Sequence, residues 1–138
     1  MQDHIKNDDM NSDGPSPRER IINLLNVKSV IKAQTFDQCL EVFNVLKDVL
    51  SEMSNDLNDM LENNGARRVR LEYRDRGKFE AELKFADDVL IFSLHTDIFE
   101  FDRDHPVWKN PYAKDNPYNT YCGVISVYNF LYDSMKYN

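Results

Sequence analysis

Apolar residues follow a helical period up to about residue 64 and a period of two from about residue 69. Between Thr35 and Asn64 they recur at alternating steps of three and four, the pattern of an amphipathic helix. The apolar side consists of Phe36, Cys39, Phe43, Leu46, Leu50, Met53, Leu57 and Met60. Thr35 to Gln38 has the composition of a capping box, and Gly65 suits a left-handed helix end. We therefore expect a long helix of about 40 Å between these signals.

A shorter helix is expected ahead of the long one. Ser16, Pro17 and Glu19 have the spacing of a capping box with proline at the first helical position. Four apolar residues then give this helix one apolar side: Ile21, Ile22, Leu24 and Leu25. Residues 1–14 are rich in Asn, Asp and Ser, so we expect a flexible acidic tail followed by a single domain at 15–138.

The period of two beyond Gly65 predicts a β-hairpin with one apolar face. The apolar positions are Val69, Leu71, Tyr73, Phe79, Ala81, Leu83 and Phe85. All are odd-numbered, so the connecting loop must contain an odd number of residues. We expect a three-residue loop, Asp75-Arg76-Gly77, with Gly77 in the left-handed region. This loop pairs Tyr73 with Phe79 and Leu71 with Ala81.

A third strand is expected after a two-residue turn at Asp87-Asp88. It would place Leu90, Phe92 and Leu94 on the buried face, and Val89 and Ile91 outward. Pro106, Pro111 and Pro117 predict an irregular segment over residues 99–119. Residues 121–138 fit either a helix or a strand, and we favour a short strand or turn that leads into a C-terminal helix. The predicted class is α+β, with a short helix and one long amphipathic helix packed on an antiparallel three- to four-stranded meander, an aromatic loop and a C-terminal helix or strand.

Composition narrows the classes of function. The 138 residues are 41% apolar and 30% charged, which are ordinary globular values. The net charge of −7 argues against nucleic acid as the main partner, because that affinity depends on cationic contacts. The longest strongly apolar run is Val89 to Phe92, which is too short to cross a bilayer. We therefore expect no membrane association and no signal peptide. The expected location is the cytoplasm. Cys39 and Cys122 match no metal-binding or redox spacing, and no cofactor is indicated.

The 99–119 segment carries the first candidate site. It holds the only tryptophan, Trp108, and a repeated Asn-Pro-Tyr that supplies the candidate residues Asn110, Tyr112, Asn116 and Tyr118. Rigid aromatic rings braced by proline suit a surface that binds a peptide, a sugar or another small molecule. The alternative is that these rings fold back and fill the open end of the sheet core. The sequence leaves both interpretations open.

A second candidate site depends on strand register. The registers above place Glu72, Glu80 and His95 side by side on three strands, where opposite residues lie ~5 Å apart. Two carboxylates and an imidazole at that distance could share a metal ion or act as an acid–base pair. The alternative is a solvated charge ladder on an exposed sheet face.

The expected helix is about twice as long as the expected strands, which extend roughly 20 Å. Its surplus, taken as the Met53 to Leu61 end, needs an apolar partner. The first helix, the C-terminal segment or a second copy could be that partner, and we favour a homodimer through the long helix or the sheet edge. The predicted function is a non-catalytic binding or protein-interaction module that uses the aromatic loop. The alternative is a metal-binding protein or hydrolase-type enzyme that uses the Glu72, Glu80 and His95 cluster.

Overall fold

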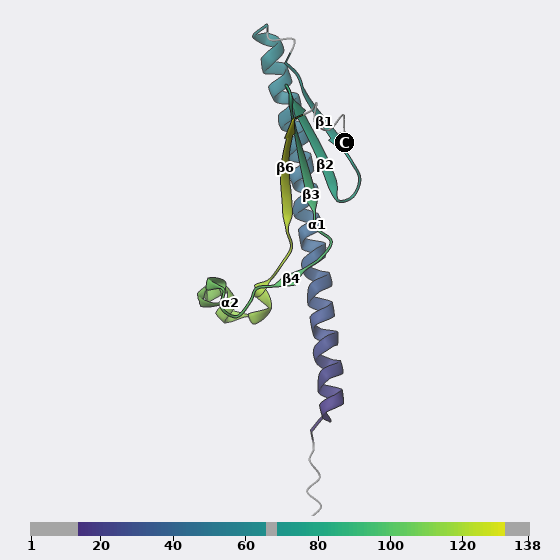
Figure 1. The fold of residues 1–138 in the computed structure, drawn as a ribbon, viewed down its shortest axis with the longest axis vertical. Helices are drawn as coiled ribbons and strands as arrows, with labels where there is room; N and C mark the ends of the chain where they lie inside the picture. Colours follow the sequence, from purple (N-terminus) through teal and green to yellow (C-terminus); the bar gives the residue numbers. More distant parts are fainter. Residues whose placement is uncertain (1–13, 66–68, 132–138) are drawn as a thin grey trace, which may run out of the picture.

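The computed structural model describes residues 14–65 and 69–131, which form one long helix, an antiparallel sheet and a helical insertion (Figure 1). The predicted α+β class, with a long helix packed on an antiparallel meander, is confirmed. The tail predicted at residues 1–14, apart from Gly14, lies outside the described residues, as do residues 132–138 of the C-terminal segment. Within the described residues, no helix combines the length and apolar character needed to cross a bilayer.

Helix α1 (Pro17–Asn63) starts and ends at the predicted signals. The Ser16 hydroxyl accepts a hydrogen bond from the backbone N–H of Glu19 at 3.2 Å, and the Glu19 carboxylate accepts the Ser16 N–H at 2.9 Å. This reciprocal capping satisfies two donors that a helix start leaves free. At the other end Gly65 has φ +78, the left-handed value that glycine adopts without strain.

The expectation of two separate helices is wrong, because α1 is continuous over 47 residues, about 70 Å at 1.5 Å per residue. Thr35 lies inside the helix, and its hydroxyl donates to the Ile31 carbonyl oxygen at 2.8 Å instead of capping a new start. No glycine or proline occurs between Pro17 and Gly65, so nothing in the sequence requires a break. A cap-like tetrapeptide starts a helix only where the preceding backbone leaves the helical conformation.

The main sheet has the strand order β1-β2-β3-β6, and all its neighbouring strands are antiparallel. Its strands are β1 (Leu71–Asp75), β2 (Glu80–Phe85), β3 (Asp88–Leu94) and β6 (Ile125–Leu131). Strand β6 settles the C-terminal ambiguity in favour of a strand over residues 125–131. Strands β1 and β6 form the two edges of the described sheet.

The predicted hairpin register is wrong by four residues along β2, although the odd number of residues in the loop and the apolar face are correct. Tyr73 pairs with Leu83, Leu71 pairs with Phe85, and the loop is residues 77–79. Gly77 has φ +112, as the left-handed prediction required. Phe79 lies outside the β1–β2 ladder, and its ring packs edge-on against Phe36 of α1, with centroids 5.8 Å apart. Both registers bury the same face, so the apolar pattern alone does not choose between them.

The second turn is also displaced from its predicted position. The turn residues are Ala86 and Asp87, not Asp87 and Asp88, and Ala86 has φ 48. The buried face of β3 is the predicted one. Val89 and Ile91 are nevertheless buried, contrary to expectation. They lie on the other face of a central strand, where long side chains of β2 and rings of β6 flank them.

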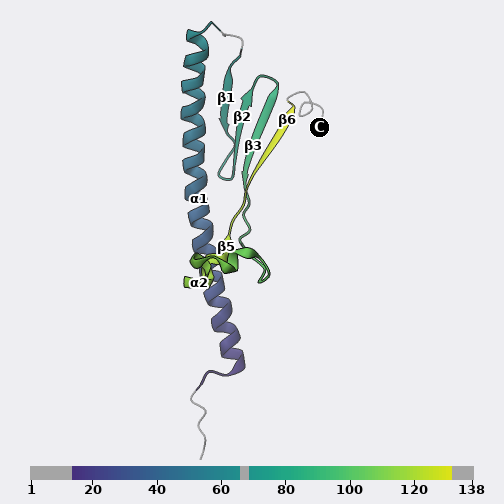
Figure 2. The same ribbon diagram turned by 90° about the vertical axis from the view of Figure 1, so that its left-hand side faces the viewer.

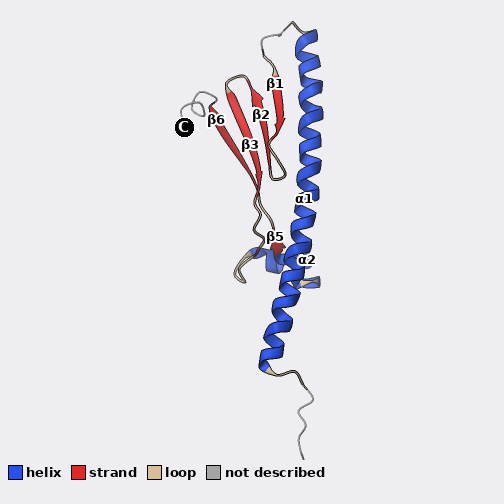
Figure 3. Ribbon diagram, turned by 90° about the vertical axis from the view of Figure 1, so that its right-hand side faces the viewer, coloured by secondary structure: helices blue, strands red, loops and turns tan. Residues whose placement is uncertain are grey.

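The core lies between the second half of α1 and one sheet face. Its buried members are Phe43, Leu50, Ala81, Leu83, Phe92 and Leu94. The sheet covers only this half of the helix, and the first part of α1 extends beyond it (Figures 2 and 3). The Met53 to Leu61 end, which was expected to be the surplus, lies beside the sheet, where the Asn58 side chain bonds both backbone groups of Leu71 at 2.8 Å. Its apolar side chains Met53, Leu57 and Met60 are nevertheless exposed. The helical surplus lies at the N-terminal end.

The insertion (residues 99–122) separates β3 from β6 and lies beside the middle of α1 (Figure 1). Strands β4 (Phe99–Glu100) and β5 (Tyr121–Cys122) pair at its base. Between them are three short helical segments, η1 (Pro106–Lys109), α2 (Pro111–Asp115) and η2 (Pro117–Thr120). The prediction of an irregular segment is wrong, and the prolines explain why.

Candidate functional site

Each helical segment of the insertion starts with a capping residue followed by proline. The Asn110 side chain accepts the N–H of Tyr112 at 2.9 Å, and the Asn116 side chain accepts the N–H of Tyr118 at 3.1 Å. His105 does the same through Nδ1 for the N–H of Val107 at 3.1 Å. Proline at the first helical position has no N–H to satisfy, so it favours a helix start. The repeated Asn-Pro-Tyr therefore encodes two helix starts.

Trp108 packs within the insertion and is not part of the sheet core. Its indole N–H donates to the Phe101 carbonyl oxygen at 3.1 Å, and the Arg103 guanidinium lies 4.3 Å from the ring centroid. The side chain is half-buried. The insertion has its own small core of Ala113, Thr120 and Tyr121. The interpretation of Trp108 as a plug for the open end of the sheet is therefore wrong.

A cleft of about 480 Å³ lies between α1 and the insertion. Its walls combine aromatic rings with charges of both signs. The lining residues are Leu24, Lys28, Glu100, Phe101, Asp102, Arg103, Trp108, Pro117, Tyr118 and Tyr121. A small ligand in this cleft would meet ring faces beside two cations and two carboxylates. Lys28, Arg103 and Tyr121 were not predicted as site residues, because only the fold brings them to Trp108.

The electrostatics of the cleft favour the neutral form of the Tyr121 phenol. Burial, and then the neighbouring Glu100 carboxylate, raise the pKa of Tyr121, so its hydroxyl remains a hydrogen-bond donor at neutral pH. Lys28 Nζ lies 4.0 Å from a Glu100 carboxylate oxygen, and both side chains are partly exposed. The arrangement can orient a polar ligand, but no described contact in it pairs a nucleophile with a base.

The other candidate residues of the aromatic loop do not converge on one site. Tyr118 lines the cleft, whereas Tyr112 is 65% exposed and is not among the lining residues. The side-chain oxygens of Asn110 and Asn116 are engaged as caps. Of the five predicted residues, only Trp108 and Tyr118 line the cleft.

Glu72, Glu80 and His95 are not brought together, because the registers that predicted the cluster were wrong. Glu72 pairs with Lys84 and Glu80 pairs with Ser93. His95 Nε2 lies 3.0 Å from the Ser126 hydroxyl, at the start of β6. Within residues 14–65 and 69–131, no group of three or more His, Cys, Asp or Glu side chains is arranged to hold a metal ion.

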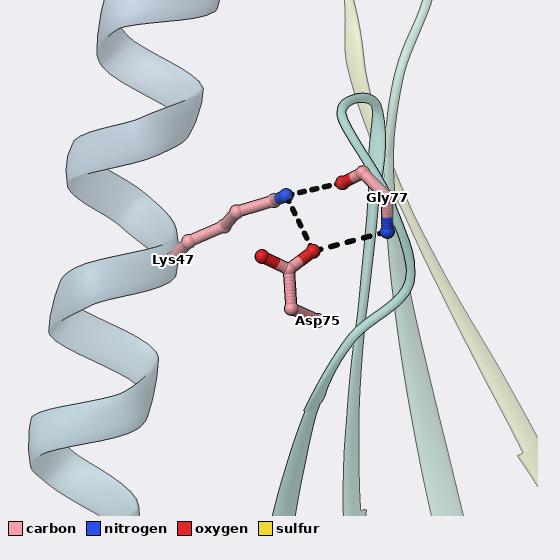
Figure 4. A network of polar contacts seen from close by, with 3 residues as sticks. All are labelled: Lys47, Asp75 and Gly77. Carbon is pink, nitrogen blue, oxygen red and sulfur yellow. Dashed lines mark hydrogen bonds and ion pairs between the residues drawn. The ribbon is translucent and has the colours of Figure 1, made fainter.

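The most buried charge of the described residues belongs to Lys47, which joins α1 to the first hairpin (Figure 4). Its ammonium donates to the Asp75 carboxylate at 2.8 Å and to the Gly77 carbonyl oxygen. The same carboxylate oxygen accepts the Gly77 N–H at 3.0 Å. These hydrogen bonds hold the pKa of Asp75 below its usual value, and the bond from Lys47 has the largest effect. The group closes the hairpin loop onto the helix, so we assign it a structural role.

The sequence contained an indication that Lys47 is buried, but the apolar periodicity alone did not reveal it. It is the only cation among seven acidic residues in the second part of α1, yet it lies between Phe43 and Leu50 on the apolar side. Such a lysine must find an anion or carbonyl partner, or lose its charge. The sequence does not show which partner the fold supplies.

A second surface of α1 carries apolar side chains that face solvent. We call this surface the open stripe, and it consists of Leu24, Val27, Ile31, Val42, Val45, Val49 and Met53. Six of these are at least 40% exposed, and Ile31 is half-buried. Their spacing of three or four, with about three turns between Ile31 and Val42, places them along one side of the helix. Figure 3 shows the sheet on one side of α1 and the insertion overlapping the middle of the helix in this view. Within the stripe, Leu24 lines the cleft beside the insertion, and Val42 lines a hollow with Tyr121 and Ile125.

The two cysteines meet where β5 leads into β6. Added to Gly123, a Cβ would lie 2.7 Å from Cys39 Sγ, so only glycine lets the chain pass this close to α1. Burial and the neighbouring Cys39 raise the pKa of Cys122, which keeps the thiol protonated and weakly nucleophilic. A thiol-based catalytic site here has no support from this environment.

Comparison with known proteins found no matching family model, no similar curated protein and no similar solved structure. The chemistry of the described surfaces is therefore the basis for the function proposed below.

Proposed function

We propose that this chain is a non-catalytic protein-interaction module that docks through the open stripe of α1. The observation that carries the proposal is the exposure of Val42, Val45 and Val49, each more than half accessible on one side of the helix. Isolated exposed apolar side chains are ordinary, but a contiguous row of them is typical of an interaction surface. An amphipathic helix that offers anchors at steps of three and four fits a helical partner.

Burial on the opposite side of the helix supports this assignment. Phe43, Lys47, Leu50 and Ser54 face the sheet and are buried. Val45 and Val49 are therefore not needed to hold the sheet, whereas Val42 borders a hollow that Leu94 and Ile125 of the sheet also line. Exposed valine also lowers helix propensity relative to polar straight-chain residues. Intrinsic helix stability therefore does not account for these residues.

Site-specific photocrosslinking in the native cells tests the proposal. We expect a photoreactive residue at Val45 to form one discrete adduct, whereas the same residue at Asn44 should form none. Asn44 is exposed but points about 100° away around the helix, which makes it the matched control. Equal labelling at both positions, or none at either, would remove the support for a docking surface.

The cleft beside the insertion is a second candidate, favoured by its size and by the rings of Trp108 and Tyr118 in its wall. It suits a small polar ligand with a flat ring, which could stack on these side chains. Ligand-observed NMR against a fragment set that contains aromatic acids and amines would test it. Signals lost in a Trp108→Phe/Tyr118→Ala variant would support the cleft, and signals retained there would reject it.

A further inference from the structure

We propose that the partner of the open stripe is the same stripe of a second copy, with the two α1 helices antiparallel. This inference rests on the proposed function and deepens it by naming the partner and its orientation. Three observations carry it: the charge distribution along α1, the self-complementary spacing of the stripe, and the area that the stripe can bury.

The charge distribution along α1 selects the orientation. The first part of the helix carries Arg18, Arg20, Lys28 and Lys32 against Glu19, a net +3. The second part carries Asp37, Glu41, Asp48, Glu52, Asp56, Asp59 and Glu62 against Lys47, a net −6. A parallel pair would place the two acidic parts side by side, and like charges in contact are costly. An antiparallel pair places each acidic part beside a basic one.

The spacing of the stripe is compatible with this orientation. If two antiparallel helices cross at Gln38, Val27 of one copy lies opposite Val49 of the other, and Ile31 lies opposite Val45. In the same register Arg20 lies opposite Asp56. Both Arg20 and Asp56 are exposed and project close to the line of the stripe. The symmetric pair therefore has two apolar pairs, Val27 with Val49 and Ile31 with Val45, on each side of the crossing point, and an ion pair toward each end.

The area is sufficient for a specific dimer. Seven partly exposed apolar side chains from each copy, with the polar side chains that flank them, would bury on the order of 1,200 Å², the lower end of the range for specific interfaces. The sheet packs on another side of α1 (Figure 2), and the insertion lies beside the crossing point, where Gln38 and Val42 share a hollow with Tyr121 and Cys122. We expect a dimer that forms at micromolar concentration.

Sedimentation velocity of the full chain over a concentration series tests the contact. We expect a dimer, and we expect Val45→Glu/Val49→Glu to be monomeric at every concentration with an unchanged thermal melt. Asn44→Glu is the matched control, since it adds one charge to the same turn and should remain dimeric. A dimer that survives the double substitution, or a wild-type chain that is monomeric throughout, would overturn the proposal.

Charge exchange within one chain tests the orientation. Arg20→Asp and Asp56→Arg should each raise the dissociation constant about tenfold, because each turns two attractive contacts into repulsive ones. The combined variant should recover wild-type affinity, since the antiparallel pair then matches again. In a parallel pair both positions face their own copies, so each substitution replaces one repulsive like-charge pair by another and the single variants would keep the wild-type affinity. Single variants with wild-type affinity, or a combined variant as weak as the single ones, would overturn the orientation.

The photocrosslink at Val45 separates this inference from the function on which it rests. An adduct with the mass of two copies supports both. An adduct with a different protein, together with a monomeric wild-type chain, overturns self-association and leaves the interaction surface standing. No adduct at Val45 in cells and no dimer in solution would overturn both.

Discussion

Replacing Lys47 separates two contributions that this side chain makes to stability. The stem of the buried lysine packs between α1 and the hairpin, and its ammonium bonds Asp75 and Gly77. Lys47→Ala removes three buried methylenes, about 2.4 kcal/mol at ~0.8 kcal/mol each. Lys47→Met keeps nearly the whole stem and removes only the ammonium.

The polar contribution of Lys47 is expected to be small. The Asp75 side chain is 61% exposed, so water screens the ion pair and solvates the carboxylate when the lysine is removed. The ammonium also regains its hydration on unfolding, which opposes the gain from its hydrogen bonds. We therefore expect Lys47→Met to cost about 1 kcal/mol and Lys47→Ala about 3 kcal/mol. Urea denaturation followed by far-UV circular dichroism measures both, and equal losses would refute the reasoning.

The difference in stability between the wild type and the Lys47→Met variant is predicted to depend on pH. The pKa of Asp75 is lowered in the folded state, first by the Lys47 hydrogen bond, so its contribution is fully present above the unfolded pKa of about 3.9. The contribution is lost as pH falls through the lower folded value. Lys47→Met removes the main cause of the shift. The stability difference between wild type and Lys47→Met should therefore narrow between about pH 5 and pH 2, and a constant difference would contradict this account.

Two further substitutions test the insertion and its junction with α1. Trp108→Phe should cost about 1 kcal/mol for the indole hydrogen bond and Trp108→Ala about 2 kcal/mol in a thermal melt, because the ring is half-buried; a loss above ~4 kcal/mol would place it in a core. Gly123→Ala should cost about 1–3 kcal/mol in urea denaturation, because its Cβ would meet Cys39 Sγ at 2.7 Å. Adding Cys39→Ala should recover part of that loss, and full additivity would contradict the clash.

The features that the sequence alone determined depend on interactions within a few residues. The cap at Ser16 and Glu19, the left-handed Gly65 and Gly77, and the odd-numbered hairpin loop follow from local hydrogen bonding and from the two-residue period of a strand. The prediction of which side of the strands faces the helix was correct for the same reason. Of the five residues predicted in the aromatic loop, Trp108 and Tyr118 line the cleft.

Tertiary structure decided whatever depends on a distant partner. Two hairpin registers bury the same face, and only the folded structure shows which of them forms. The choice of register separated Glu72, Glu80 and His95, since a shift along the ladder changes every neighbour across it. Thr35 begins a sequence that is typical of a helix cap. It does not cap a helix, because the residues before it are already helical. The open stripe became visible only when the fold showed which side of α1 the sheet covers, because periodicity records apolar positions without naming their partners.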